Sequence, residues 1–431
     1  MRLPPIAPAD LSPAPQDVRK DAASKAAAPA KNRRAKAQPE HAKPSGTPFE
    51  SVALLLQGGG AMGAYQAGVY EALTEAGVEP TWIAGISIGA INCAIIAGNK
   101  PEDRIAKLRT FWERVSAGPD PWLKLWGGPF DNDWTREIAG QLAAAGTMAG
   151  GVAGFFTPRF PPPVWAPPGT ENATSWYSTA ALRETLEELV DFDRINTGGM
   201  RFSVGAVNVR TGNFAYFDSE TDTIGPAHIM ASGALPPAFG AVEIGGEYYW
   251  DGGLVSNTPL DWLLSARSGL DTLIFQVDLW SARGELPRDL AEVAVRMKEI
   301  QYSSRTRSAT DAFRQLQKMR TAFNELLAQM PPALAATPQA KLLAAASDPA
   351  VYNIVQLVYR SPTYEGQAKD YEFSRRAMED HWRDGRNDAL KTLSHPEVLR
   401  PPAGINSVAV YDFLTPSPGH NAGLQPEKDT P

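Results

Sequence analysis

The chain has 431 residues, of which 43% are hydrophobic, and this length allows two or three domains with buried cores. Its formal net charge is −7, and we expect no nucleic-acid partner. The single cysteine, Cys93, excludes an internal disulfide and is consistent with a reducing compartment.

The N-terminal tail, residues 1–47, carries nine Lys or Arg and four Asp or Glu, with almost no large apolar side chains. Such a composition cannot bury a core and predicts a disordered basic tail. The tail either contacts anionic lipid or stays solvated without a partner. Because residues 1–15 contain prolines and lack the apolar stretch of a secretion signal, we expect a cytoplasmic protein.

A glycine-rich turn follows the first predicted strand, 52–56, and precedes a predicted helix over 64–73. Its sequence over 58–63 fits G-x-G-x-x-G, and amides at a helix N-terminus bind anions. The anion is either a dinucleotide pyrophosphate or the oxyanion of a tetrahedral intermediate, unless the glycines only allow close helix–strand packing. A dinucleotide site needs an acid after the second strand, whereas the nearest one, Glu79, precedes that strand. We therefore favour an oxyanion hole.

The second strand, 82–84, leads into the pentapeptide 85–89, which reads G-I-S-I-G, and an apolar helix is predicted over 90–97. A serine in a sharp strand-to-helix turn is held in a strained conformation that exposes its hydroxyl. Glycines on either side leave room for the helix and the substrate. This setting makes Ser87 a candidate nucleophile.

An insert over 118–176 interrupts the pattern of strands and helices. The insert and the segment just before it hold six of the eleven tryptophans: Trp112, Trp122, Trp126, Trp134, Trp165 and Trp176. Residues 138–156 carry no formal charge, but their Ala and Gly content argues against a membrane span. The insert is either a lid that docks on a lipid interface or a satellite core under a long loop.

A hairpin over 242–250 delivers Asp251 to a Gly-Gly corner. Such a corner is usually only a turn, but a serine nucleophile needs a base to take its proton. Only His228 among the histidines lies within reach in the sequence, and a lone histidine at a helix start is more often a core or capping residue. A carboxylate serves as base when burial raises its pKa, so we predict a dyad of Ser87 and Asp251.

The remaining elements are a hairpin of 201–209 with 214–217 and a strand at 272–279 that closes the domain. Alternating strands and helices predict a mostly parallel sheet with helices on both faces. Beyond residue 281 apolar residues recur at helical spacing, and we expect these stripes to pack on the catalytic domain, with a coiled coil or partner site as the alternative. Residues 351–359 have strand composition, and Ser374 is placed to cap a helix that runs to about Leu393.

The glycine turn, the pentapeptide and Asp251-Gly-Gly resemble, in order and spacing, the motifs of patatin-like phospholipases. Residues 231–239 and 253–260 resemble two further segments of that family, and the match covers roughly 50–280. Segment 364–393 resembles the C-terminal extension of one bacterial subgroup. Met62 stands where many members carry Arg or Lys, which affects any phosphate-holding role of that side chain.

The resemblance implies a three-layer α/β/α fold over 48–280, followed by a mainly helical extension over 281–415. The polar residues at the C-terminus, with Pro and Gly among them, predict a disordered tail over 416–431. It implies hydrolysis of a lipid or other acyl ester without a metal or cofactor. The oxyanion hole would be formed by Gly58, Gly59 and Gly60. The supporting motif glycines would be Gly63, Gly85, Gly89, Gly252 and Gly253.

We therefore expect a serine acyl hydrolase that touches membranes at most peripherally. In the mechanism expected from these motifs, Ser87 attacks the ester carbonyl and Asp251 accepts the hydroxyl proton. The alternative is a catalytically inactive lipid-binding or scaffolding protein of the same fold.

Overall fold

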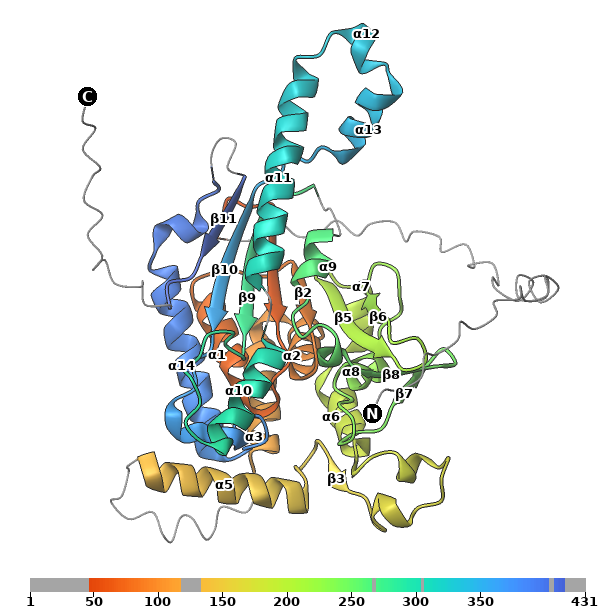
Figure 1. Ribbon diagram of the computed structural model, residues 1–431, viewed down its shortest axis with the longest axis vertical. Helices are drawn as coiled ribbons and strands as arrows, with labels where there is room; N and C mark the ends of the chain where they lie inside the picture. Colours follow the sequence, from red (N-terminus) through yellow and green to blue (C-terminus); the bar gives the residue numbers. More distant parts are fainter. Residues whose placement is uncertain (1–45, 118–132, 266–268, 304–305, 403–406, 415–431) are drawn as a thin grey trace, which may run out of the picture. The chain divides into compact units, whose positions relative to one another are not determined.

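The computed structural model describes residues 46–117, 133–265, 269–303, 306–402 and 407–414 (Figure 1). The tails expected to be disordered fall almost wholly outside these ranges, as do Trp122 and Trp126 of the insert. The described residues therefore cover most of the predicted catalytic domain and most of the extension.

Nine of the described strands form one sheet in the order β11-β10-β9-β1-β2-β5-β8-β7, with β6 paired to β5. Six consecutive strands of this order pair in parallel: β11 (Val408–Tyr411), β10 (Tyr352–Val358), β9 (Thr272–Asp278), β1 (Ser51–Leu56), β2 (Trp82–Gly85) and β5 (Arg201–Asn208). Strand β5 is antiparallel to its other two neighbours, β6 and β8. Three are antiparallel: β6 (Phe214–Asp218), β7 (Val242–Ile244) and β8 (Glu247–Asp251). The predicted mostly parallel sheet and both hairpins are confirmed.

Strand β1 shows how the sheet is buried on both faces. Val52, Leu54 and Leu56 belong to the larger core, and the alternating Ala53 and Leu55 belong to the smaller one. The larger core also takes in residues of α1 (Ala64–Glu75), α2 (Ile88–Ala97) and α3 (Arg104–Val115). The smaller core takes in residues of α9 (Leu260–Ser265) and α11 (Thr306–Ala328). The expected three-layer arrangement follows.

Other helices lie in the insert, beside it and in the C-terminal region. They are α5 (Asp133–Gly150), α6 (Ala180–Leu189), α7 (Phe192–Thr197), α8 (Pro226–Ser232), α10 (Leu290–Tyr302), α12 (Pro332–Ala335), α13 (Pro338–Ala346) and α14 (Arg375–Leu393). A two-stranded sheet joins β3 (Thr157–Pro158) to β4 (Tyr177–Ser178). Within the described ranges, none of the helices combines the length and apolarity needed to cross a membrane.

The C-terminal region is helical, as expected, but it also extends the central sheet. Strand β9, expected to close the catalytic domain, lies between β1 and β10, and β11 pairs with β10. Helix α14 packs along α1 (Figure 1) and buries Trp382 in the larger core. The extension and the catalytic part therefore share one sheet.

The expectation that the apolar stripes of the extension pack on the catalytic domain is wrong for α10, and in α11 Leu316, Met319 and Leu326 are also 40 to 55% exposed. Leu290, Val293, Met297 and Ile300 are 39 to 86% exposed. The charged side chains of this helix make ion pairs instead, Arg296 with Glu299 on the helix itself and Lys298 with a carboxylate in a later segment. Helical spacing gives the amphipathic pattern but does not say which face meets the protein.

Candidate active site

Ser87 occupies the turn between β2 and α2 with φ 56° and ψ −123°. Among the described non-glycine residues it alone has a positive φ. Its amide donates a hydrogen bond to Ser232 Oγ at 2.9 Å, which fixes the turn. A Cβ on Gly85 would lie 2.5 Å from the backbone of Gly89, and a Cβ on Gly89 would lie 2.2 Å from the Leu56 carbonyl oxygen. The strained turn therefore requires both glycines, as the motif predicted.

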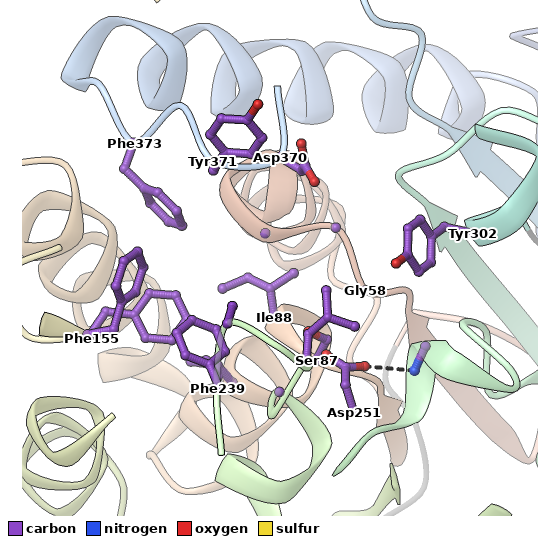
Figure 2. A pocket seen from close by; sticks show the side chains of 18 of the residues that line it. Gly58, Ser87, Ile88, Phe155, Phe239, Asp251, Tyr302, Asp370, Tyr371 and Phe373 are labelled. Carbon is purple, nitrogen blue, oxygen red and sulfur yellow. Dashed lines mark hydrogen bonds between the residues drawn. The ribbon is translucent and has the colours of Figure 1, made fainter. Parts of the chain in front are cut away.

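Asp251 ends β8, which pairs with β5, and is 2% exposed. One carboxylate oxygen accepts a hydrogen bond from the Gly253 amide at 2.7 Å (Figure 2). Burial raises the pKa of Asp251 to about 7, while hydrogen bonds from the Ser87 hydroxyl and the Gly253 amide act in the opposite direction. A carboxyl with this pKa, bonded to a serine hydroxyl, can accept a proton near neutral pH.

The glycine turn begins at the end of β1 and leads into a 3-10 helix, Gly60–Gly63. The Gly58 amide donates to the Asn257 carbonyl at 3.4 Å, and the Gly58 carbonyl accepts from Asn257 Nδ2 at 3.0 Å. Gly58 is thus held by the loop that follows Asp251. Because its amide already donates to Asn257, the expectation that Gly58 contributes to the oxyanion hole is not supported, and Gly59 and Gly60 remain as candidates. Gly59 and Gly60 carry the amides at the N-terminus of the short helix, where amides lack intrahelical acceptors.

Two further motif glycines serve close packing. A Cβ on Gly63 would lie 2.6 Å from the side chain of Ile88, next to the nucleophile. A Cβ on Gly252 would lie 2.8 Å from the Gly205 carbonyl oxygen in β5. Met62, at the position where many relatives are basic, is fully buried in the larger core and so acts as a packing residue.

A buried polar side chain, Gln57, connects the glycine turn to neighbouring elements. Its Oε1 accepts hydrogen bonds from the amides of Leu279 and Trp280 at 2.6 and 3.0 Å. Its Nε2 donates to Thr258 Oγ1 at 2.9 Å and to the Tyr302 carbonyl at 3.1 Å. A fully bonded buried amide of this kind rigidifies the turn, because losing any partner leaves a desolvated polar group.

A cavity of about 290 Å³ contains Ser87 and Asp251 in its lining. Apolar side chains dominate one side of it, including Ile88, Met148, Phe155, Phe156, Phe239 and Phe373. Trp280, Tyr302, Asp370 and Tyr371 also line it. Figure 2 shows Phe155, Phe239 and Phe373 on one side of Ser87 and Tyr302 on the other.

The insert contributes both to this cavity and to the core. Phe155 and Phe156 are buried and pack against Phe239 and Phe373 with ring centroids 5.3 to 6.5 Å apart. Met148 near the end of α5 lines the cavity and is 51% exposed. Because Phe155 and Phe156 belong to the larger core, the satellite core expected under this loop is wrong for these two residues. The interpretation of the insert as a lid or an interface-docking surface stays a prediction.

Four cavity residues come from the extension, and the sequence pattern assigns them no chemistry: Tyr302, Asp370, Tyr371 and Phe373. In the sequence, segment 364–393 stands out only by its resemblance to one subgroup. No local pattern says that a segment more than 280 residues after Ser87 returns to it.

His228 is not among the residues that line the cavity. Its Nδ1 accepts a hydrogen bond from the Gly225 amide at 3.0 Å, and its ring packs on Phe217. Burial lowers the pKa of His228. The histidine therefore stabilises the start of α8, in agreement with the capping interpretation. Within the described ranges, no three His, Cys, Asp or Glu side chains gather as a metal ion would need.

A family model described as patatin-like phospholipase matches residues 54–264, and one described as patatin phospholipase matches residues 300–404. No curated protein matches the chain. The solved structure of VipD from Legionella pneumophila is similar to this chain, with 16% sequence identity and a TM-score of 0.35. The match covers 81% of this chain and 67% of the VipD chain. The type III effector protein ExoU has 15% sequence identity to this chain and a TM-score of 0.28. The match covers 82% of this chain and 54% of the ExoU chain. The chain thus spans about two thirds and about half of those two proteins.

Proposed function

The chain belongs to the patatin-like phospholipase family, and we propose that it is a serine acyl hydrolase that cleaves carboxylic esters of lipid character. One observation carries the proposal: Ser87 in a strained turn shares a hydrogen bond with the buried Asp251, whose pKa burial raises to about 7. Burying a carboxyl group and straining the serine backbone both cost folding free energy, so a purely structural role does not explain them. Proton transfer from Ser87 at neutral pH, in contrast, needs a nearby base whose pKa is raised in this way.

In this mechanism the Ser87 oxygen attacks the ester carbonyl while Asp251 takes the hydroxyl proton. The carbonyl oxygen becomes an oxyanion, and the amides of Gly59 and Gly60 donate hydrogen bonds to it. Each such donor lowers a barrier of this kind by about 3 kcal/mol. Asp251 then passes the proton to the departing alcohol, which leaves Ser87 acylated. Water, deprotonated by Asp251, attacks the acyl group and restores both residues.

The two sides of the cavity support an assignment of the substrate's two parts. Phe155, Phe156 and Phe373 form an apolar arm that suits an acyl chain. Tyr302 lies on the other side of Ser87 (Figure 2), where the alcohol or headgroup would lie. We propose that the acyl chain occupies the phenylalanine arm. The size of this arm would then set which acyl-chain lengths the enzyme prefers.

The decisive experiment is labelling by a fluorophosphonate probe, wild type against Ser87→Ala, with hydrolysis of a p-nitrophenyl ester series. We expect the wild type to be labelled and to turn over esters, and the variant to do neither. Circular dichroism of both proteins controls for folding. A folded wild type that is not labelled, even with lipid vesicles present, would favour the inactive lipid-binding alternative.

We also propose that the protein contacts lipid surfaces peripherally through the insert. Leu142 is 62% exposed, Phe160 92% and Trp165 73%, and Met148 joins this surface to the cavity. Aromatic and aliphatic side chains of this kind are suited to the edge of a bilayer. Flotation with neutral phosphatidylcholine vesicles tests this: Phe160→Asp combined with Trp165→Asp should abolish cofractionation. Unchanged flotation of the double variant would exclude this surface.

A further inference from the structure

We propose that two ion pairs between α10 and residues 369–370 position the oxyanion turn, so that the C-terminal extension is part of the catalytic machinery. These pairs, Lys298 with Asp370 and Glu299 with Lys369, are called here the double bracket. The inference rests on the proposed function, because it assigns a role to the glycine turn. It names Lys298 and Lys369 as positioning residues.

Both elements joined by the double bracket hold the catalytic loops through backbone carbonyls. The Tyr302 carbonyl, at the end of α10, accepts hydrogen bonds from Gln57 Nε2 at 3.1 Å and Asn257 Nδ2 at 2.9 Å. It therefore connects the start of the glycine turn to the loop that follows Asp251.

On the other side, the Asp370 carbonyl accepts a hydrogen bond from the Ala61 amide at 2.9 Å. A Cβ on Gly60 would lie 2.0 Å from that same carbonyl oxygen. Gly60 itself has φ +57° and carries one of the two amides assigned to the oxyanion hole. The segment thus rests directly on the turn, and its position limits where the Gly60 amide points.

The double bracket fixes the spacing between these two holding points. Lys298 Nζ lies 2.8 and 2.9 Å from the two Asp370 oxygens, and Lys369 Nζ lies 2.9 Å from Glu299 Oε1. A lysine precedes an acid on both elements, so each charge faces its opposite. Lys369 is only 4% exposed, and breaking a buried pair is more damaging than breaking a surface pair. Arg296 also pairs with Glu299, at 3.0 Å.

The lysines also contact the aromatic side chains of the cavity. Lys369 Nζ lies 5.1 Å from the ring centroid of Trp280, whose indole donates to the Gly58 carbonyl at 3.0 Å. Lys298 Nζ lies 5.0 Å from the ring centroid of Tyr371. Neither lysine lines the cavity, so an effect on catalysis must pass through the groups they hold. A misplacement of about 1 Å costs roughly a hundredfold in rate.

The test compares Lys298→Gln with Lys298→Arg, which keeps the ion pair. The matched control is Arg386→Gln, which removes another pair between the extension and the catalytic part, Arg386 with Glu75 at the far end of α1. We expect Lys298→Gln to lower kcat at least tenfold with KM little changed. Lys298→Arg should recover most of kcat, and Arg386→Gln should leave it unchanged.

A double-mutant cycle with Asp370→Asn then tests whether Lys298 acts through its partner. In the Asp370→Asn background, Lys298→Gln should change kcat less than twofold. The proposal would be overturned if the effects of the two substitutions on kcat were fully additive. It would also be overturned if Lys298→Gln left kcat unchanged, or if Arg386→Gln lowered kcat as much as Lys298→Gln does.

Hydrogen–deuterium exchange of residues 57–63 tests the positioning independently of activity. Exchange there should rise severalfold in Lys298→Gln and not in Arg386→Gln, with melting temperatures recorded for both. If the wild type is inactive but shows this exchange pattern, the proposed function is rejected and the positioning role of the double bracket is retained. If the wild type is active and the pattern is absent, the proposed function is retained and the positioning role is rejected.

Discussion

Two sides of the cavity are built in different ways. The catalytic floor, meaning Ser87, Asp251 and the glycine turn, lies within a few residues of the ends of β1, β2 and β8. The outer wall, meaning Met148, Phe155, Phe373 and Tyr371, comes from the insert and the extension. Backbone hydrogen bonds and required glycines hold the floor, and the two proposed ion pairs act on its glycine turn, whereas ring contacts hold the wall.

This difference separates chemistry from substrate fit. The floor depends on positions within a rigid sheet, where a small shift disturbs the reacting atoms. The wall depends on side chains that can be truncated without moving the sheet. Substitutions in the floor should therefore lower kcat for every ester, and substitutions in the wall should change the preference among esters.

The largest effect should come from Asp251→Asn in the floor. An amide cannot accept the serine proton, so kcat should fall by about a thousandfold or more for short and long esters alike. Steady-state hydrolysis across a p-nitrophenyl ester series measures this. If Asp251→Asn retained most of the activity, Asp251 would not be the base. The division of the cavity into a catalytic floor and an outer wall would then fail.

Gly60→Ala should be next, because its Cβ would lie 2.0 Å from the Asp370 carbonyl oxygen. The turn must move to relieve this contact, and we expect kcat to fall about a hundredfold. Gly212→Ala is the matched control: φ is +69° there, but nothing lies within 4 Å of its Cβ position. Equal losses in both variants would show that backbone strain alone, and not the contact with the extension, decides the outcome.

The pH dependence of the wild type should follow Asp251. Its pKa is about 7, so the unprotonated base is lost below that pH and kcat/KM should fall about tenfold per unit of pH there. The profile is measured on a chromogenic ester from about pH 5 to about pH 9. An activity that stays level down to about pH 5 would contradict this assignment.

The same residue should make the folded protein less stable as pH rises. The pKa of Asp251 is raised from 3.8 to about 7 on folding, so between those values the folded state binds more protons than the unfolded state. The free energy of unfolding should then fall across this window, by on the order of 4 kcal/mol from this group. Asp251→Asn removes the contribution, so its melting temperature above about pH 7 should exceed that of the wild type.

The smallest effect should come from Phe373→Ala in the outer wall. Phe373 is 7% exposed and lines the cavity, so truncation removes apolar contacts with the acyl chain. We expect the ratio of kcat/KM for long over short esters to drop up to about tenfold, with kcat for short esters nearly unchanged. Leu286→Ala, at a side chain 89% exposed, is the control and should leave the ratio unchanged. An equal loss of kcat/KM for esters of every chain length would show that Phe373 supports the chemistry and not the fit of the acyl chain.

The floor could be predicted from the sequence because its motifs are local. The strand, the sharp turn and the helix around Ser87 appear in hydrophobic periodicity and glycine spacing, and the structure has them as β2, a turn with φ 56° and α2. The hairpin that carries Asp251 is predicted in the same way and is confirmed by β7 and β8. The dyad as a catalytic pair stays a prediction until the variants are assayed.

The outer wall could not be predicted. Nothing around Asp370 or Phe373 distinguishes them from other residues of a polar segment, and their role follows only from where α10 and α14 bring the chain. Helix α10 shows the limit most clearly: its spacing predicts an apolar face on the protein, yet Leu290 and Met297 are exposed and Lys298 pairs inward.

The sequence by itself determined the backbone conformations that the chemistry needs, because a positive φ or a close approach restricts which residue can stand there. Tertiary structure alone decided which distant segments cover Ser87, how deeply Asp251 is buried and hence its pKa. The physical reason is that burial and charge pairing depend on neighbours in space, and those neighbours come from strands and segments up to about 280 residues apart.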